Sequence, residues 1–382
     1  MQVRDLLIVG AGPSGLATAI AAGQHGLDYE IVEKGVLVNS IYHFPVHMVF
    51  FTTPELLEIG NLPLVTPYDK PTRIEALRYY RRVADRYKLQ VSFGETVTGL
   101  RRDPSTGILT VETRVDRVAT GTSSTGARSV GPNVRLPNAS ADSPDPSGQA
   151  LSSAIDAAAD SAPGEVRQRR ARAVALAIGY YDHPNHLDVP GEDLPHVSHY
   201  YREAHGCYRR RVVVVGGKNS AAEAALELHR AGAHVTLVHR RPTLGASIKY
   251  WVKPDIENRI AEGSIAARFS SRVVEITPEA VHLEHPEGRE ALPADQVFLL
   301  TGYHADFALL EACGIEIDPA SGVPSHDPST LESNVPGVFF AGGVLAGKDT
   351  APIFIENGRF HGERLVRVLA ERLKTAAGAA AR

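Results

Sequence analysis

The chain has 382 residues, of which 43% are hydrophobic, and carries a formal net charge of −4. This size and apolar content suit two or three globular domains, and the mild negative charge gives no reason to expect nucleic acid or an anionic membrane as a partner. With only two cysteines, Cys207 and Cys313, the composition speaks against a disulfide-stapled secreted fold and against a zinc site, and we predict no metal site.

The N-terminus reaches the apolar run "DLLIVG" after four residues, without a basic segment or a cleavage site before it. We therefore interpret this run as a strand and not as a signal peptide. No uninterrupted apolar run approaches the roughly 18 residues that a membrane helix needs. These features predict a soluble, cytoplasmic protein.

The first predicted unit is strand, glycine loop, helix and strand, ending at Glu33. In "GAGPSG" the first glycine makes the tight turn, the second lets the backbone approach a pyrophosphate, and the third packs the helix on the strand. Glu33 can accept hydrogen bonds from ribose hydroxyls, which suits FAD or NAD. The predicted contacts of this unit are Gly10, Gly12, Pro13, Ser14, Gly15, Glu33 and Lys34.

Two strands of a hairpin, "LTVETRV" and "RAVALAIG", follow, the second ending at Gly179, which we also predict to contact a cofactor. Residues 119–165 separate them and are rich in Gly, Ser, Ala, Pro and Asp, with hardly any large apolar residue. Such a tract cannot bury enough surface to order itself. We expect a disordered insertion without a catalytic role.

A second unit on the same plan begins at Gly216, and its spacing to His239 equals the spacing of 23 residues from Gly10 to Glu33. Its loop, "GGKNSA", replaces the middle glycine by Lys218 and the last by alanine. Asn219 and Ser220 at the helix start can cap the helix or donate to a phosphate. We predict nucleotide contacts from the loop residues Gly216, Gly217, Asn219 and Ser220.

The second unit ends in His239, Arg240 and Arg241 instead of an acid. Two guanidinium groups pair with a 2′-phosphate that a carboxylate would repel, so we expect NADPH here. An ordinary charged strand end is the alternative for the arginines. His239 can stack on adenine or cap the sheet edge, and Lys249 can add charge to this site or be solvated.

The last segment, "VPGVFFAGGVLAGKDTAPIFIENGRFHGERLVRVLAERL", shows a strand, a glycine turn and a helix that complete the first domain. We predict an α/β fold of two Rossmann-like, doubly wound, three-layer dinucleotide-binding domains, with the NADPH domain inserted into the FAD domain. The FAD domain takes residues 1–200 and 310–382, and the NADPH domain takes 201–309. Predicted flavin contacts in the later part are Gly302, Gly342, Gly343, Pro352, Ile353 and Phe354.

Several long stretches, among them "VEKGVLVNSIYHFPVHMVFFTTPELLEIGNLP", "VPGEDLPHVSHYY" and "IFIENGRFHG", resemble the YpdA-type bacillithiol-disulfide reductases, which are thioredoxin-reductase-like flavoproteins. The resemblance implies an FAD-bound, NADPH-oxidising cytosolic enzyme that reduces the disulfide of a small thiol, and a homo-oligomer. The Cys-x-x-Cys of thioredoxin reductases is absent, and "HYYR", residues 199–202, takes its place.

Two positions depart from the patterns that this resemblance implies. The YpdA-type loop reads Gly-Pro-Cys-Gly, whereas Ser14 stands at the cysteine position here. A hydroxyl cannot form a mixed disulfide, so the thiol step of the family is in question while the flavin chemistry is not. Gly343 stands where the wider superfamily has an aspartate that contacts the flavin.

The route by which electrons leave the flavin is open in the sequence, and the catalytic residues are unknown. Tyr42 and His47 can contact the cofactor or substrate or belong to the core, and residues 199–201 can line the substrate approach or pack between domains. A free cysteine is usually a buried residue. Direct passage of electrons through FAD to a small disulfide is the first hypothesis. The alternatives are a reductase of a protein or quinone acceptor resembling ferredoxin–NADP reductases, a flavin monooxygenase, and a non-catalytic redox sensor.

Overall fold

The computed structural model describes residues 2–116, 164–350 and 352–380. Residues 117–163, and with them nearly all of the predicted insertion, lie outside the described residues. The strands are β1 (Val3–Val9), β2 (Tyr29–Glu33), β3 (Val91–Phe93), β4 (Glu95–Arg102), β5 (Leu109–Val115), β6 (Val166–Leu176), β7 (Val197–Ser198), β8 (Arg211–Val215), β9 (His234–Val238), β10 (Ala266–Arg268), β11 (Arg272–Ile276), β12 (Ala280–His285), β13 (Gly288–Pro293), β14 (Gln296–Leu299) and β15 (Val338–Phe340). The helices are α1 (Pro13–Gln24), α2 (Asn39–His43), α3 (Pro54–Leu57), α4 (Arg73–Tyr87), α6 (Asn219–Arg230), α7 (Lys253–Ala261), α8 (Phe307–Ala312), α9 (Ile355–Gly358) and α10 (His361–Ala380), with short 3-10 turns η1 (His205–Cys207) and η2 (Gly342–Ala346).

A seven-stranded sheet in the order β3-β2-β1-β6-β5-β4, with β15 beside β6, forms the centre of the first domain. Strands β1, β2, β3, β6 and β15 run parallel. The antiparallel pair that the sequence predicts from "LTVETRV" and "RAVALAIG" is β5 with β6, and β4 adds a further antiparallel strand beside β5. The long strand β6 has two successive partners along one edge. Its first part pairs with β5, and its last three residues pair with β15. The segment after the second domain therefore returns to the first sheet, as predicted.

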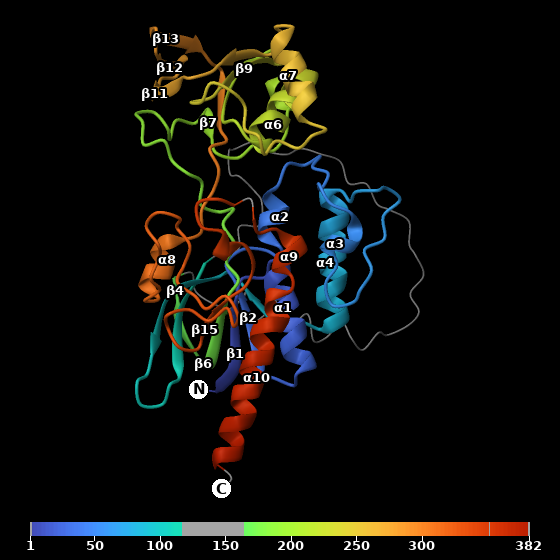
Figure 1. Cartoon of the computed structure of the whole chain (residues 1–382), viewed down its shortest axis with the longest axis vertical. Helices are drawn as coiled ribbons and strands as arrows, with labels where there is room; N and C mark the ends of the chain where they lie inside the picture. Colours follow the sequence, from blue (N-terminus) through green and yellow to red (C-terminus); the bar gives the residue numbers. More distant parts are fainter. Residues whose placement is uncertain (1, 117–163, 351, 381–382) are drawn as a thin grey trace, which may run out of the picture.

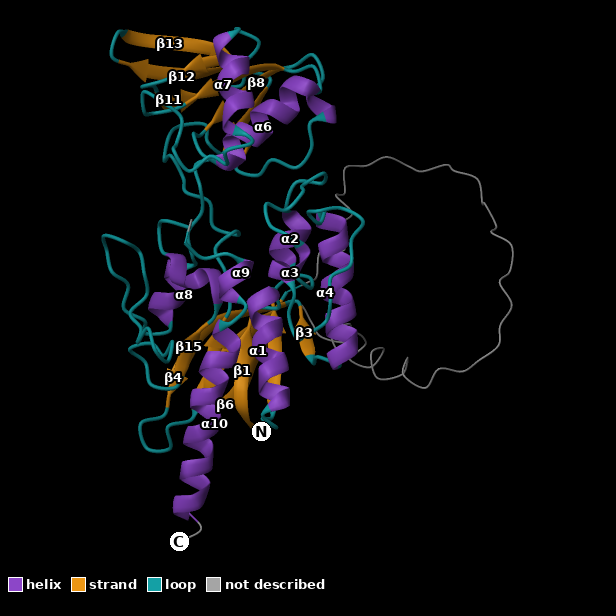
Figure 2. Cartoon of the chain, turned by 45° about the vertical axis from the view of Figure 1, so that its right-hand side comes forward, coloured by secondary structure: helices purple, strands orange, loops and turns teal. Residues whose placement is uncertain are grey.

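Strand β1 is apolar throughout its second half because both faces of this sheet are covered. Leu6 and Ile8 lie in a core with residues of α1, α4 and α10. Leu7 and Val9 point to the opposite face, into a core that includes residues of β4, β5 and α8. Figure 2 shows α1 and α10 lying across one face of the sheet. Helix α10 packs closely on α1, and a Cβ on Gly362 would collide with Thr18.

The second domain has a five-stranded sheet in the order β10-β9-β8-β14-β7, all parallel. Alanines of α6 pack on one face. The antiparallel sheet of β11, β12 and β13 covers the other face. The predicted α/β fold with one domain inserted into the other is confirmed, and the third layer of the inserted domain is this small sheet instead of a second set of helices.

Two extended segments connect the domains, and Figure 1 shows them running side by side between the lower and the upper lobe. They are held by antiparallel hydrogen bonds from Asn185 N to Gly302 O (2.9 Å) and from His304 N to His183 O (2.9 Å). β7 precedes the predicted boundary at residue 200 yet pairs with β14, and α8 begins before residue 310 yet packs near β4. We propose that the domains meet within residues 177–196 and 300–306.

None of the helices in the described part of the chain has the length and apolar content needed to cross a bilayer.

Candidate functional site

The first glycine loop joins β1 to α1 and is shaped by close backbone contacts. Gly10 has a φ of +105°, which an L side chain rarely adopts, and a Cβ on Gly15 would collide with the carbonyl of Gly10. A Cβ on Gly12 would meet nothing within 4 Å. The loop therefore leaves open space at its second glycine, in front of the N-terminus of a 12-residue helix. This is the space that a pyrophosphate needs.

Glu33 ends β2 beside this loop and is 5% exposed. Its two carboxylate oxygens accept hydrogen bonds from Ala11 N (2.7 Å) and Gly35 N (2.7 Å). Burial raises the pKa of Glu33 above its ordinary value, and these two bonds act in the opposite direction. A carboxylate has about four acceptor positions, so two remain for ribose hydroxyls.

The residues around Gly343 explain why no aspartate stands there. A Cβ on Gly343 would lie 2.8 Å from Cδ1 of Tyr180, so the tyrosine ring fills the space of the missing side chain. Gly342 lies against Ser14, since a Cβ at residue 342 would collide with Oγ of Ser14. The N–H of Gly342 donates to Nδ1 of His361 at 3.1 Å. The start of α1 and the turn η2 are thus packed directly together.

The second glycine loop joins β8 to α6. A Cβ on Gly217 would collide with the ring of His239, so the imidazole packs on the loop backbone, where its Nε2 is buried without a hydrogen bond among the described residues. Asn219 does not cap α6: its side chain donates to Ser247 O (3.2 Å) and accepts from Lys249 N (2.9 Å). Of the two roles considered for Asn219, helix capping is not observed, because its amide instead ties this loop to residues 247–249.

Arg240 and Arg241 follow β9 and are exposed. In the part of the chain that the structure describes, neither guanidinium has a carboxylate within ion-pair distance. Burial lowers the pKa of His239, and the two neighbouring positive charges lower it further. This end of the site is therefore a concentration of unpaired positive charge, as a phosphate ligand requires.

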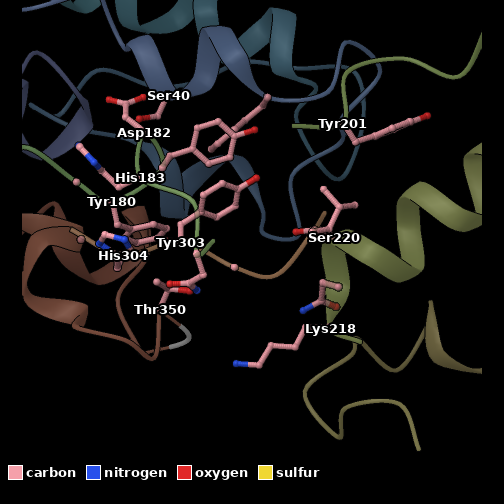
Figure 3. Close-up of a pocket in the computed structure, with 18 of the residues that line it drawn as sticks. Ser40, Tyr180, Asp182, His183, Tyr201, Lys218, Ser220, Tyr303, His304 and Thr350 are labelled. Carbon is pink, nitrogen blue, oxygen red and sulfur yellow. The ribbon is translucent and has the colours of Figure 1, made fainter. Parts of the chain in front are cut away.

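One continuous cavity of about 1860 Å³ reaches from the first loop to the second. It exceeds the roughly 300–1,000 Å³ of a site for one drug-sized ligand and suits two extended ligands. Figure 3 shows the cavity between Tyr180, Tyr303 and His304 on one side and Lys218 and Ser220 at α6 on the other. The predicted residues that line it are Gly10, Gly12, Pro13, Ser14, Glu33, Lys34, His47, Gly179, Gly216, Gly217, Asn219, Ser220, His239, Arg240, Arg241, Lys249, Gly302, Gly343, Ile353 and Phe354.

Four predicted residues do not line the cavity. Gly15 and Gly342 stand behind its wall, in the close contacts described above. Tyr42 is 41% exposed, with its ring against His43 and near the guanidinium of Arg73. The carbonyl of Pro352 accepts a hydrogen bond from the side chain of Asn357 at 2.7 Å.

Sequence reasoning missed a group of polar and aromatic residues that line the cavity. Tyr180 to His183 follow β6, and Tyr303 to Asp306 follow β14. The rings of Tyr181 and Tyr303 lie 4.7 Å apart, and Nε2 of His183 lies 3.3 Å from Asp306. Their position directly after predicted parallel strands could have indicated them, because ligand sites of open α/β sheets gather at the carboxyl ends of such strands.

Neither cysteine belongs to the cavity. Cys207 and Cys313 are 5% and 3% exposed, and burial raises the pKa of both thiols, that of Cys313 to about 11. A buried thiol that stays protonated is a poor nucleophile. No enzyme thiol is therefore placed to form a mixed disulfide with a ligand in the cavity.

The domains also touch beside the cavity. The ring of Trp251, from the second domain, lies 6.0 Å from Phe51 and 3.7 Å from the ammonium of Lys70, both in the first domain. An ion pair of 3.5 Å joins Lys218 to Asp349. These contacts hold the second glycine loop over the first domain.

Comparison with known proteins places the chain in a family. The family model described as pyridine nucleotide-disulphide oxidoreductase matches residues 7–122 and 165–342. Bacilliredoxin reductase Bdr of Bacillus subtilis is 37% identical over 96% of this chain and 97% of its own length. Solved structures of bacillithiol disulfide reductase Bdr (YpdA) are similar, one from Bacillus cereus (35% identity, TM-score 0.83, covering 97% of this chain and all of that one) and one from Staphylococcus aureus (32%, 0.80, 97% and 99%). The chain therefore belongs to the pyridine nucleotide-disulphide oxidoreductase family and, as its resemblance implies, to the YpdA-type flavoproteins that use FAD and NAD(P)H.

Proposed function

We propose that the protein is an NADPH-dependent, FAD-containing reductase of a small-thiol disulfide, with bacillithiol disulfide as the substrate. The relatives named for that substrate cover nearly the whole chain. The observation that carries the proposal is the single cavity that joins both glycine loops, because electron transfer between two cofactors and a disulfide needs all three in one space. The net reaction takes NADPH, one proton and one disulfide to NADP⁺ and two thiols.

The first domain would hold FAD. The open backbone at Gly12 and the start of α1 would take the pyrophosphate, and Glu33 would accept from the adenosine ribose. Tyr180 would lie where other members of the superfamily place an aspartate side chain. When bound, FAD supplies the acceptor for the hydride of NADPH and the donor of the electron pair to the disulfide.

The second domain would hold NADPH. Arg240 and Arg241 lack carboxylate partners among the described residues and would pair with the 2′-phosphate. Gly217, Asn219 and Ser220 line the cavity at the start of α6 and would take the diphosphate. Because a free 2′-hydroxyl would leave two guanidinium groups without their partner, this site favours NADPH over NADH.

The substrate end of the cavity would work without an enzyme thiol. Ser14 lines the cavity at the cysteine position of the YpdA-type loop, and both cysteines are buried. Nε2 of His183 lies 3.3 Å from Asp306, which would leave Nδ1 as the nitrogen that holds a proton for a thiolate product. Its bond to Asp306 lowers the pKa of that carboxyl, so Asp306 stays ionised and orients the imidazole.

Both cysteines are free thiols, as a reducing compartment would keep them. We propose that the enzyme acts in the cytoplasm. The homo-oligomeric state that the resemblance implies stays a prediction.

The decisive experiment is anaerobic stopped flow. The flavin is first reduced with NADPH, then mixed with bacillithiol disulfide, and its absorbance band is followed. Rapid reoxidation is the expected result. Flavin that stays reduced with the disulfide but is reoxidised by ferredoxin or by a quinone would overturn the proposal in favour of a protein or quinone reductase.

A further inference from the structure

Two histidines and one glutamate converge at the first connecting segment, where His186 also lines the cavity while Glu192 and His199 do not. His186 and Glu192 lie within this segment, and His199 follows directly after β7. Nδ1 of His186 and Nε2 of His199 lie 3.3 Å and 3.2 Å from the same oxygen, Oε1 of Glu192. The three candidate ligand atoms all lie within 4.8 Å of one another.

These distances match a metal site better than a hydrogen-bond network. Nε2 of His199 is buried and makes no hydrogen bond among the described residues, although the carboxylate oxygen is within reach. Zinc bonds to nitrogen and oxygen of about 2.0–2.1 Å give tetrahedral edges of about 3.3 Å. The distances from Oε1 of Glu192 to Nδ1 of His186 (3.3 Å) and to Nε2 of His199 (3.2 Å) already match two edges of such a tetrahedron. The third closes when the ring of His186, which is 51% exposed, rotates toward His199.

The carboxylate is fixed before any ion arrives. Oε1 of Glu192 accepts from Leu187 N (2.8 Å) and Oε2 accepts from Asp188 N (2.7 Å), while its side chain is 6% exposed. A Cβ on Gly191 would collide with the carbonyl of Ile276, so the turn is seated on β11. Outer hydrogen bonds of this kind orient metal ligands.

We propose that His186, Glu192 and His199 form a zinc site. Two imidazoles and one carboxylate are ligands that zinc accepts, and with three protein ligands the fourth position is left to water. This proposal departs from the prediction of no metal site, which rested on the small number of cysteines and did not consider ligand sets of histidine and glutamate.

The position of the site gives the ion a role in domain motion. Asn185, next to His186, is bonded to Gly302 and Thr301 of the second connecting segment. The carbonyl of His199 accepts from the hydroxyl of Tyr303 (3.2 Å), whose ring lines the cavity. Bound zinc would therefore tie the first connection to the inserted domain and restrain movement of that domain over the flavin.

The test uses the full-length, FAD-bound protein after removal of metal by a chelator. Zinc is titrated against a chromophoric competitor, and bound metal is counted by mass spectrometry after dialysis. We expect one zinc per chain, with affinity reduced at least about tenfold in His186→Ala. Because His186 is half exposed, we expect this variant to keep the fold, and His205→Ala, at an exposed histidine of η1, is the matched control.

A second measurement separates this site from the proposed reaction. Zinc is expected to raise the melting temperature of the wild type and of His205→Ala but not that of His186→Ala, because a ligand that binds only the folded state stabilises it. Absence of bound zinc in the wild type, or binding that His186→Ala and Glu192→Gln leave unchanged, would overturn the proposal. Neither result depends on which disulfide the enzyme reduces.

Discussion

The ring of Tyr180 occupies the space into which any side chain at Gly343 would point, because a Cβ at residue 343 would lie 2.8 Å from the ring. Returning the superfamily's aspartate in Gly343→Asp would therefore overpack the site. We expect a cost of about 1–3 kcal/mol, and if all of it falls on the bound state this is a loss of FAD affinity of about 5- to 150-fold. The ratio of flavin to protein absorbance after gel filtration measures it.

The control for this substitution is Gly206→Asp, since a Cβ at residue 206 meets nothing within 4 Å. That variant should keep its flavin. The double variant Tyr180→Ala/Gly343→Asp should recover part of the lost affinity, because it removes the ring that collides with the new side chain. Full flavin content in Gly343→Asp alone would contradict the explanation.

The two arginines after β9 are predicted to select the nucleotide. Replacing Arg240 and Arg241 together by alanine removes charge-assisted hydrogen bonds worth about 1.5–3 kcal/mol each, so kcat/KM for NADPH should fall by at least about 100-fold while the value for NADH changes little. Rates of flavin reduction by the two nucleotides measure this. Arg289→Ala, an exposed arginine of β13, should leave both rates unchanged. Equal losses with NADPH and NADH would mean that these arginines do not read the 2′-phosphate.

The buried cysteines predict a protein without a reactive thiol. Cys207 and Cys313 are almost inaccessible and their pKa values are raised by burial, so iodoacetamide should label neither in the native state. Ser14→Cys should add one rapidly labelled position, since residue 14 lines the cavity. Mass spectrometry of labelled protein, with an unfolded sample as the positive control, gives the count. Labelling of the native wild type would reopen the search for an enzyme thiol.

Glu223 on α6 is predicted to make the stability of the protein depend on pH. Burial, and then the charge of Glu227, raises the pKa of Glu223 to about 7. Its folded-state pKa is above the unfolded value, so the stability it contributes is complete below pH 4.5 and is lost as pH rises through about 7. Glu223→Gln should match the wild type below pH 4.5 and exceed it by about 1–2 kcal/mol above neutrality, after allowance for partial exposure.

Melting temperatures of the FAD-bound protein across this pH range test the point. Glu227→Gln is the informative partner, because removing its charge should lower the pKa of Glu223 and flatten part of the pH dependence. A difference between wild type and Glu223→Gln that is the same at all pH values would show that Glu223 does not titrate in this range.

Sequence patterns within single βαβ units predict most of the fold. The first loop, the helix after it and Glu33 follow from residue spacing, because each reports on the geometry of one βαβ unit. The role of Gly343 could not be predicted in this way. Its lack of a side chain is explained by Tyr180, which comes from a strand more than 160 residues earlier and meets it only when β15 pairs with β6.

Contacts between residues distant in the sequence also explain why the sequence did not indicate several cavity side chains. Tyr181, His183 and Tyr303 follow two strands of different sheets, and they meet only because the two connecting segments run side by side. Asn219 has the sequence position of a cap, yet its amide is bonded to residues 247–249. Helix-start preferences are local, whereas this competition is decided by a loop that lies close only in the folded chain.

Trp251 is the only tryptophan of the chain, and it stands at the contact between the domains, beneath the ammonium of Lys70 and beside Phe51. Any movement that separates the domains removes the cation and the aromatic ring from an indole that is already 40% exposed, and so changes the surroundings of the fluorophore. Intrinsic fluorescence thus responds to domain opening, whereas the yellow colour of the flavin reports on electron transfer. The protein carries its own label for timing one event against the other.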